Sequence, residues 1–335
     1  MAYLYLVVIC TAVVSGTVGN SMVIAAVLIT KKLKTVGNMF IVNLALADLC
    51  VTAFVDPFSI IGIILGEGWF VVRPVICETV ASICLTSCFC SLLSIGTVSF
   101  NRYIHICHNE LYPKIFTKTK SFFMCIALWV ICFLAEMSCF IGWGDHSFDK
   151  KTLSCVWDRT ADFSYTLFFA LVGVAFPVTL ISICYVRIYR FVNASKIRVG
   201  AQRDDGQPQK DFSNQRQESM RLARTLFIIF AVFAACWTPY AIIVVADRYD
   251  TYPMEIHIFS ILVAHTNSSL NSILYGLTNA NFREGYKQIA MFFFGWLPFS
   301  CLRRNASAEL TCNSMTDNSN GKRNKTATTF ETTAY

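Results

Sequence analysis

The chain has 335 residues, of which 55% are hydrophobic and 15% are charged, and its mean hydropathy is +0.52. Soluble domains average about 45 to 50% apolar and about 25% charged residues, so this composition excludes an ordinary soluble protein. The net charge of +7 does not point to nucleic acid, because the basic residues gather in connections between apolar segments, where they would face anionic lipid and cytosolic partners.

Seven apolar segments follow one another along the chain, and each is long enough to cross a bilayer as a helix. They lie near residues 2–30, 38–65, 75–104, 121–143, 163–190, 222–246 and 256–277. Helices satisfy their own backbone hydrogen bonds in lipid, which predicts an all-α bundle of seven transmembrane helices. The amphipathic stretch 280–296 predicts a short cytoplasmic helix after the bundle. We therefore expect a seven-helix domain at 1–302 and a disordered cytoplasmic tail at 303–335, rich in Ser, Thr and Asn.

The distribution of basic residues predicts the orientation in the cell membrane. The tail and the connections after the first, third and fifth segments, with the helix ends beside them, hold 23 of the 28 lysine and arginine residues. Because basic residues favour the cytoplasmic side, we expect an extracellular N-terminus and a cytoplasmic C-terminus. The chain begins almost directly in an apolar run without a basic leader, so we expect the first helix to direct insertion.

Most of the 15 cysteines lie inside apolar segments, where we expect them to be small core residues. Cys77, at the outer start of the third segment, and Cys155, in the second outer connection, lie together in an oxidising compartment. We therefore predict a disulfide between them. Cys301 follows the amphipathic stretch and is a candidate for palmitoylation.

Polar groups inside the apolar segments are costly in lipid and therefore mark candidate functional positions. They are Asn20, Asp48, Asn101-Arg102-Tyr103, Trp129, Pro177, Cys236-Trp237-Thr238-Pro239 and the stretch from Asn271 to Tyr275. Arg102 follows Cys77 by 25 residues, which along a helix is roughly 37 Å, one membrane crossing. The order and spacing of these groups, over roughly residues 1–302, resemble the rhodopsin-like class of G-protein-coupled receptors.

Within this class, several motifs resemble those of the melatonin receptors. Asn101-Arg102-Tyr103 is followed by an Ile-Cys-His run that ends at His108, and the stretches 233–239 and 271–283 are also similar. Three positions depart from that subfamily, because its ligand-site His, Gln and Asn are replaced here by Gly173, Arg159 and Cys139. We therefore infer a shared scaffold with an unknown small-molecule ligand.

The resemblance implies three sets of site residues. The set for activation and G-protein coupling is Asn101, Arg102, Tyr103, Tyr185, Trp237, Pro239, Asn271 and Tyr275. The set that would line the ligand pocket is Cys84, Leu85, Cys88, Phe169, Gly173, Trp237, Tyr240, Ala241, Val244 and His265. The set that would hold a sodium ion is Asp48, Ser91, Asn267, Ser268 and Asn271, with a polar network lacking an ion as the alternative. We expect no other cofactor or metal.

The pocket set is apolar and aromatic. Receptors for biogenic amines carry Asp at the position of Cys84, so a standard amine anchor is missing. Two further acids lie at membrane depth, Asp56 in the outer half of the second helix and Glu136 in the fourth. Each could anchor a cationic ligand or be satisfied by neighbouring helices.

The Arg102 motif also predicts a resting activity. Most receptors of this class carry an acid at the position of Asn101, and that acid pairs with the arginine. A second acid often stands at the base of the sixth helix, where this chain has Ser219 beside Glu218. An amide cannot neutralise a guanidinium, so we expect measurable ligand-independent coupling.

The resemblance further implies a heterotrimeric G protein as partner, of the inhibitory class by analogy with melatonin receptors, and arrestin and receptor kinases at the tail. Alternatives are a non-retinal opsin-like receptor, a peptide or lipid receptor, and a transporter or channel. Opsins carry a lysine six residues before Asn271, and His265 stands there, so a retinal Schiff base is not expected. No inverted repeat or broken helix favours a transporter. No nucleophile, metal or phosphate motif favours an enzyme.

Overall fold

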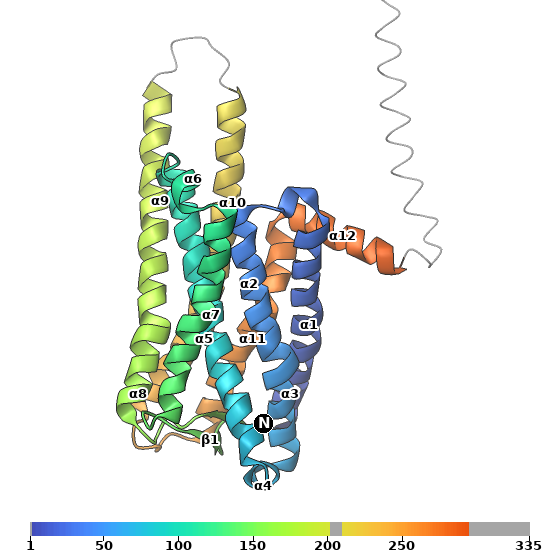
Figure 1. Ribbon diagram of the computed structural model, residues 1–335, viewed down its shortest axis with the longest axis vertical. Helices are drawn as coiled ribbons and strands as arrows, with labels where there is room; N and C mark the ends of the chain where they lie inside the picture. Colours follow the sequence, from blue (N-terminus) through green and yellow to red (C-terminus); the bar gives the residue numbers. More distant parts are fainter. Residues whose placement is uncertain (1, 202–209, 295–335) are drawn as a thin grey trace, which may run out of the picture. The chain divides into compact units, whose positions relative to one another are not determined.

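The computed structural model describes residues 2–201 and 210–294. The chain divides into two units, Met1–Lys287 and Gln288–Tyr335, and the fold described here is that of the first. Its membrane-length segments run alongside one another (Figure 1), which confirms the predicted all-α bundle. The seven segments are α1 (Ala2–Ile29), α2–η2–α3 (Val36–Cys50, Val51–Val55, Asp56–Leu65), α5 (Pro74–Cys107), α7 (Lys118–Phe140), α8–η3–α9 (Phe163–Phe168, Phe169–Ala175, Phe176–Ala201), α10 (Lys210–Ala246) and α11 (Met254–Thr278).

Short elements connect these segments. They are η1 (Lys31–Leu33), α4 (Glu67–Val71), α6 (Tyr112–Ile115) and the strands β1 (His146–Asp149) and β2 (Ser154–Trp157). The helix α12 (Ala280–Phe294) begins at the residue predicted for the amphipathic helix. The fourth segment begins three residues earlier than predicted, because Thr117 caps its first turn by accepting a hydrogen bond from the Lys120 amide. It also ends three residues earlier, just before Gly142, whose φ is +92°.

Six of the seven segments are long and apolar enough to be recognised as membrane spans by length and composition. Among the described helices of membrane length, α11 is the exception, because buried polar side chains lower its hydropathy. These side chains include His257, His265, Asn267, Ser268 and Asn271. The helix packs against α1 and α10, so its polar groups face other helices and not lipid.

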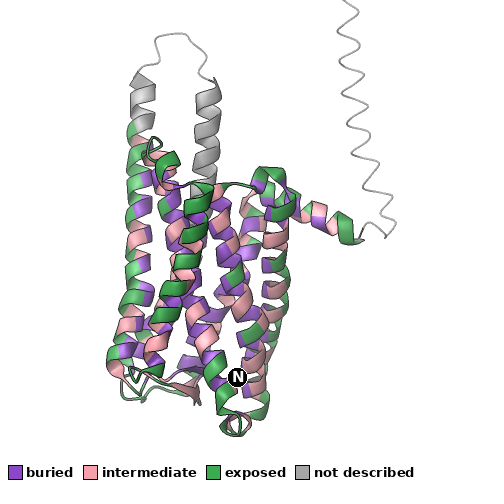
Figure 2. Cartoon of the chain, in the orientation of Figure 1, coloured by how far each residue is buried: buried purple, intermediate pink, exposed green. Residues whose placement is uncertain are grey.

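Where burial is described, most long helices of the first unit have buried residues on one side and exposed residues on the other (Figure 2). The helix α5 is largely buried and α7 is mostly exposed. Large apolar side chains such as Phe122, Phe133 and Leu134 lie exposed on α7, as expected for a surface that faces lipid. Polar bonds join the helices inside: Asn43 of α2 donates to Ser94 Oγ of α5 (2.8 Å) and accepts from Trp129 Nε1 of α7 (2.9 Å).

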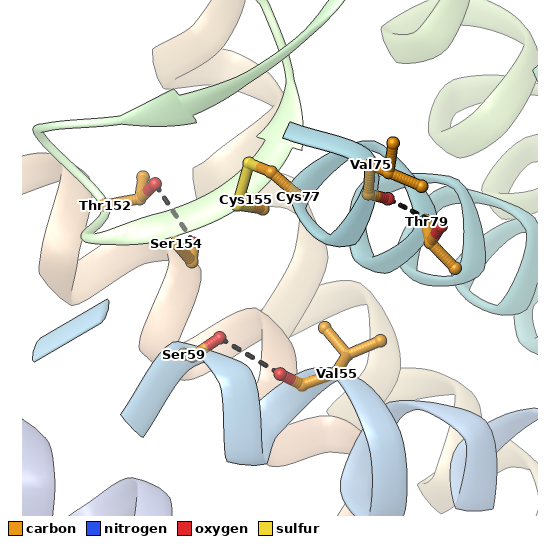
Figure 3. Close-up of a disulfide and its surroundings, with 8 residues drawn as sticks. All are labelled: Val55, Ser59, Val75, Cys77, Thr79, Thr152, Ser154 and Cys155. Carbon is orange, nitrogen blue, oxygen red and sulfur yellow. Dashed lines mark hydrogen bonds between the residues drawn. A yellow bond between two sulfur atoms is a disulfide. The ribbon is translucent and has the colours of Figure 1, made fainter. Parts of the chain in front are cut away.

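The hairpin β1–β2 is fixed to two helices. Its antiparallel strands place Phe148 opposite Cys155, and Cys155 is bonded to Cys77 in the first turn of α5. The predicted disulfide is therefore confirmed (Figure 3). The turn of the hairpin rests on α3, because a Cβ added at Gly62 would lie 2.2 Å from the backbone oxygen of Leu153. In the following paragraphs the outer end of each helix is the one nearer this disulfide.

Some predicted features lie outside the described residues. They are the side chains of Glu218 and Ser219, the palmitoylation candidate Cys301, the domain boundary at 302 and the tail at 303–335.

Candidate functional site

Arg102 lies near the inner end of α5 and is held by packing without a charge partner. Its side chain is buried, with 8% of the residue exposed, and Nε has no hydrogen-bond partner. Among the described residues, no carboxylate lies within ion-pair distance of it. A Cβ added at Gly37 of α2 would lie 2.7 Å from Arg102 Nη2, so the guanidinium rests on the α2 backbone. Asn101 donates to the hydroxyl of Tyr112 in α6 (3.4 Å), while its Oδ1 has no partner.

Two further residues predicted for activation, Tyr185 and Tyr275, lie in the interior of the bundle. Tyr185 of α9 packs on Phe230 of α10, and Tyr275 of α11 stacks on Phe282. The hydroxyls of both tyrosines are buried without a hydrogen-bond partner. The third motif residue, Tyr103, bonds His108 through its hydroxyl (3.0 Å).

Trp237 and Pro239 lie nearer the outer end of α10 than Phe230 does. Trp237 stacks on Phe233 of the same helix, with ring centroids 6.2 Å apart, and contacts Tyr240 edge to face. Pro239 lies inside α10, where its ring removes a backbone hydrogen bond and permits a bend. The tryptophan is therefore next to a weakened point of the helix.

Two of the predicted sodium residues, Ser91 and Asn271, bond the buried carboxylate of a third, Asp48. Asp48 is fully buried; its Oδ1 accepts from Ser91 Oγ (2.9 Å) and its Oδ2 from Asn271 Nδ2 (2.8 Å). Asn267 and Ser268 are buried on the same helix as Asn271. The amide oxygens of Asn267 and Asn271 are buried without a hydrogen-bond partner, which leaves them available as ligands. Because a hard cation binds carboxylate, amide and hydroxyl oxygens, this set of residues fits sodium.

The residues predicted for the ligand pocket are all buried, and they come from α5, η3, α10 and α11. Two aromatic residues that were not predicted fill the space among them. Trp157 of β2 packs on Phe169 with ring centroids 4.1 Å apart, and it meets Tyr240 edge to face. Its place two residues after Cys155 could have indicated this, because the disulfide holds that strand over α5.

The second unpredicted residue is Phe89 of α5. Its ring stacks on Phe169, and a Cβ added at Gly173 would lie 2.1 Å from its Cε1. The phenyl ring therefore takes the volume that a larger side chain at position 173 would need. The histidine found at this position in melatonin receptors would require the Phe89 ring to move.

Both membrane-depth acids have protein partners. Asp56 Oδ1 lies 2.7 Å from His265 Nδ1, and His265 Nε2 lies 3.9 Å from Cys84 Sγ. Glu136 Oε1 lies 2.6 Å from Nε2 of His146 on β1. Each acid therefore has a histidine partner for one oxygen, while Asp56 Oδ2 and Glu136 Oε2 are buried without a hydrogen-bond partner.

A network of charges joins the second and third outer connections. Asp247 accepts from His257 Nε2 of α11 (2.8 Å) and lies near Lys151 Nζ (3.6 Å). Arg159 pairs with Asp250, and Lys151 Nζ lies 2.8 Å from the same carboxylate. Arg159 occupies the position at which melatonin receptors carry a ligand-site glutamine. In this chain its guanidinium forms ion pairs within the network.

Comparisons with known proteins identify relatives of the same architecture. The family model described as 7 transmembrane receptor (rhodopsin family) matches residues 19–275. The chain is 33% identical over 289 residues to melatonin receptor type 1B of Rattus norvegicus, covering 84% of this chain and 76% of the relative. It is 33% identical over 292 residues to melatonin receptor type 1C of Gallus gallus, covering 85% and 81%. The crystal structure of squid rhodopsin superposes with a TM-score of 0.77 at 23% identity, covering 90% of this chain and 87% of the other, which shows the shared fold.

The family match covers well over half of the chain, and its members are receptors rather than enzymes. The chain therefore belongs to the rhodopsin family of seven-transmembrane receptors.

Proposed function

We propose that the chain is a G-protein-coupled receptor of the cell membrane, with its N-terminus outside, that responds to a small, largely apolar molecule. The observation that carries the proposal is the column of buried polar groups between the pocket and Arg102. In this column Asp56 and His265 border the pocket, Asp48 and Asn271 bond at mid-depth, and Arg102 lies at the inner end. A change in helix packing at the pocket would thus alter the position of Arg102, because the buried polar groups between them can form their hydrogen bonds in only a few arrangements.

The partners follow from this proposal. The G protein would meet the inner end of the bundle around Arg102, and the similarity to melatonin receptors supports the inhibitory class. Arrestin and receptor kinases would act on the Ser- and Thr-rich tail. The orientation is supported by the Cys77–Cys155 bond, which needs an oxidising compartment, and by basic residues at the opposite ends of the helices.

The ligand would differ from melatonin, although the relatives named above are melatonin receptors. Gly173 and Arg159 replace two residues of that subfamily's ligand site, and the space beside Gly173 is taken by Phe89. Cys84 replaces the amine-binding acid of other receptors, and Asp56 is paired with His265. These features support an uncharged aromatic ligand, and they do not support retinal, which would need a lysine at position 265.

The proposal is tested by expressing the chain in cells and recording cAMP and calcium while a panel of small apolar compounds is applied. We expect at least one compound to lower cAMP, melatonin to be inactive, and Arg102→Ala to abolish the response at equal surface expression. A response that persists in Arg102→Ala would show that signalling does not pass through this arginine.

We further propose that sodium binds at Asp48 and stabilises the resting arrangement of the helices. Added sodium should then lower agonist affinity, by less than tenfold, because the cation and the contracted active bundle compete for the same oxygens. In Asp48→Asn, which loses the charge and keeps the size, the sodium effect should disappear. The measurement is agonist displacement with sodium exchanged for a bulky organic cation. An unchanged sodium response in Asp48→Asn would favour a polar network without an ion.

A further inference from the structure

Three metal-binding side chains converge at the outer end of α7, outside the pocket described above. They are Glu136 and Cys139 of α7 and His146 of β1, and one donor atom of each lies within 4.8 Å of the others. Carboxylate oxygen, thiolate sulfur and imidazole nitrogen are the donors that Zn²⁺ takes in proteins. The three residue types therefore match a zinc site with one position left for water, in which the metal would replace the hydrogen bond between His146 Nε2 and Glu136 Oε1.

The local fold explains why these three groups meet. Glu136 and Cys139 are three residues apart, so they lie on the same face of α7. The chain then reverses through Gly142 and Gly144, whose φ angles of +92° and +102° are readily adopted only by glycine. A Cβ added at Gly144 would lie 3.1 Å from Cys139 Sγ, so the turn closes tightly over the thiol. The reversal returns His146 to the carboxylate of Glu136.

The burial and hydrogen bonding of the donor groups support a bound metal ion between them. Glu136 is fully buried, and its Oε2 has no hydrogen-bond partner, although its Oε1 is bonded to His146. Cys139 is buried and is a free thiol. A buried carboxylate oxygen without a partner is costly, and coordination to a metal would satisfy it.

The charges also balance. A Zn²⁺ ion held by one carboxylate, one thiolate and one neutral imidazole forms a group with no net charge, which can be buried near the membrane surface at low cost. Binding would release the proton of the Cys139 thiol to water and, where His146 is protonated, one of its two ring protons, which leaves the imidazole neutral. No electron transfer is involved.

A second group of possible ligands on the outer side does not match a metal equally well. Asp247, Asp250 and His257 also have donor atoms within 4.8 Å of one another. Their carboxylates, however, are already paired with Lys151 and Arg159. A metal would have to expel two cations of the protein itself, so this group serves as an ion-pair network.

We propose that Glu136, Cys139 and His146 form an extracellular zinc site that clamps the hairpin β1–β2 to α7. The same hairpin is fixed to α5 by the Cys77–Cys155 disulfide and carries Trp157 into the candidate pocket. Zinc binding would thus attach the hairpin, which forms part of the pocket wall, at a second point, and this attachment would be reversible. The site does not depend on the identity of the ligand.

The test uses the purified full-length receptor in lipid nanodiscs, stripped of metal with a chelator and titrated with Co²⁺ as a spectroscopic stand-in for Zn²⁺. We expect a thiolate-to-cobalt charge-transfer absorption that saturates at one equivalent and disappears when Zn²⁺ is added. It should be absent from Cys139→Ala and unchanged in Cys10→Ser, which removes an exposed free thiol on α1. Cys139→Ala leaves the Glu136–His146 bond in place and is therefore expected to fold.

A second measurement needs no variant. Zn²⁺ at tenfold above its dissociation constant should raise the thermal unfolding midpoint of the natural protein, because a ligand that binds only the folded state stabilises it. The proposal is overturned if the natural protein gives no charge-transfer band, if Cys139→Ala gives the same band, or if Zn²⁺ leaves the unfolding midpoint unchanged.

Discussion

Replacing Asp247 with alanine is expected to destabilise the outer side of the receptor by about 2 to 3 kcal/mol, because it leaves buried partners without their counter-charge. The residue is only 2% exposed, and it accepts from His257 Nε2 and from the amide of Thr251 (2.6 Å). Lys151 and Arg159 lie within 4 Å of the same carboxylate. The value is set below that of a fully enclosed pair because Asp250, which shares both cations, is partly exposed. The measurement is thermal unfolding of the purified receptor.

The control for this change is Glu67→Ala. Glu67 pairs with Lys150 on the same side of the protein (3.0 Å), but both side chains are well exposed. Exposed pairs contribute about 0 to 1 kcal/mol, so this variant should unfold almost as the natural protein does. Equal unfolding midpoints for Asp247→Ala and Glu67→Ala would show that the network does not hold the outer connections together.

The same residue predicts a pH dependence. Burial alone would raise the pKa of Asp247, but hydrogen bonds from His257, Tyr252 and Thr251 outweigh burial and place the pKa below its usual value. Its contribution to stability is therefore complete above pH about 4, where the unfolded carboxyl is ionised, and is lost as the pH falls further. We expect no loss of stability from this group between neutral pH and pH 5.

Asn101→Asp is expected to lower ligand-independent signalling about fivefold. Arg102 has no acid beside it among the described residues, and the Oδ1 atom of Asn101 is buried without a partner. A carboxylate at position 101 would add a charge-assisted bond, roughly twice as strong as an amide bond, and favour the resting state by about 1 kcal/mol. Since 1.4 kcal/mol is tenfold in population, this corresponds to about fivefold. Basal cAMP at matched surface expression is the readout.

Asn109→Asp is the matched control, because it adds the same charge at an exposed position just beyond α5. It should leave basal signalling unchanged. If Asn101→Asp has no more effect than Asn109→Asp, the missing acid does not set the resting equilibrium. Glu218, whose side chain lies outside the described residues, would then be the next acid to replace.

The helices could be predicted because each depends on local composition, and the disulfide because the predicted topology left few cysteines on the oxidising side. Membrane-length apolar runs can form only a few structures in lipid, and only two cysteines lay in an oxidising compartment with a partner nearby. Asp48 could likewise be placed with Ser91 and Asn271, because a buried acid requires polar neighbours and these residues matched a known pattern.

The polar pairs and the filling of the pocket could not be predicted in the same way. The pairing of Asp56 with His265 joins residues 209 positions apart, and its distance depends on how α3 and α11 pack. The ring of Phe89 reaches Gly173 only because η3 lies against α5. Such contacts follow from tertiary packing, about which spacing along one chain gives no information.

The segment η2 (Val51–Val55) is a π-helical turn, and this affects how the sequence aligns with those of its relatives. Five residues wound with i to i+5 bonds turn less about the helix axis than the same residues in an α-helix. In a regular α-helix, Asp48 and Asp56 would point in different directions around the helix axis. The smaller rotation through η2 reduces this difference, and both carboxylates contact α11. A relative whose second helix is regularly wound should align with a one-residue gap within 51–55. Without that gap, every residue from Asp56 to the end of α3 would be aligned with a residue of the relative that is one position away from its structural equivalent.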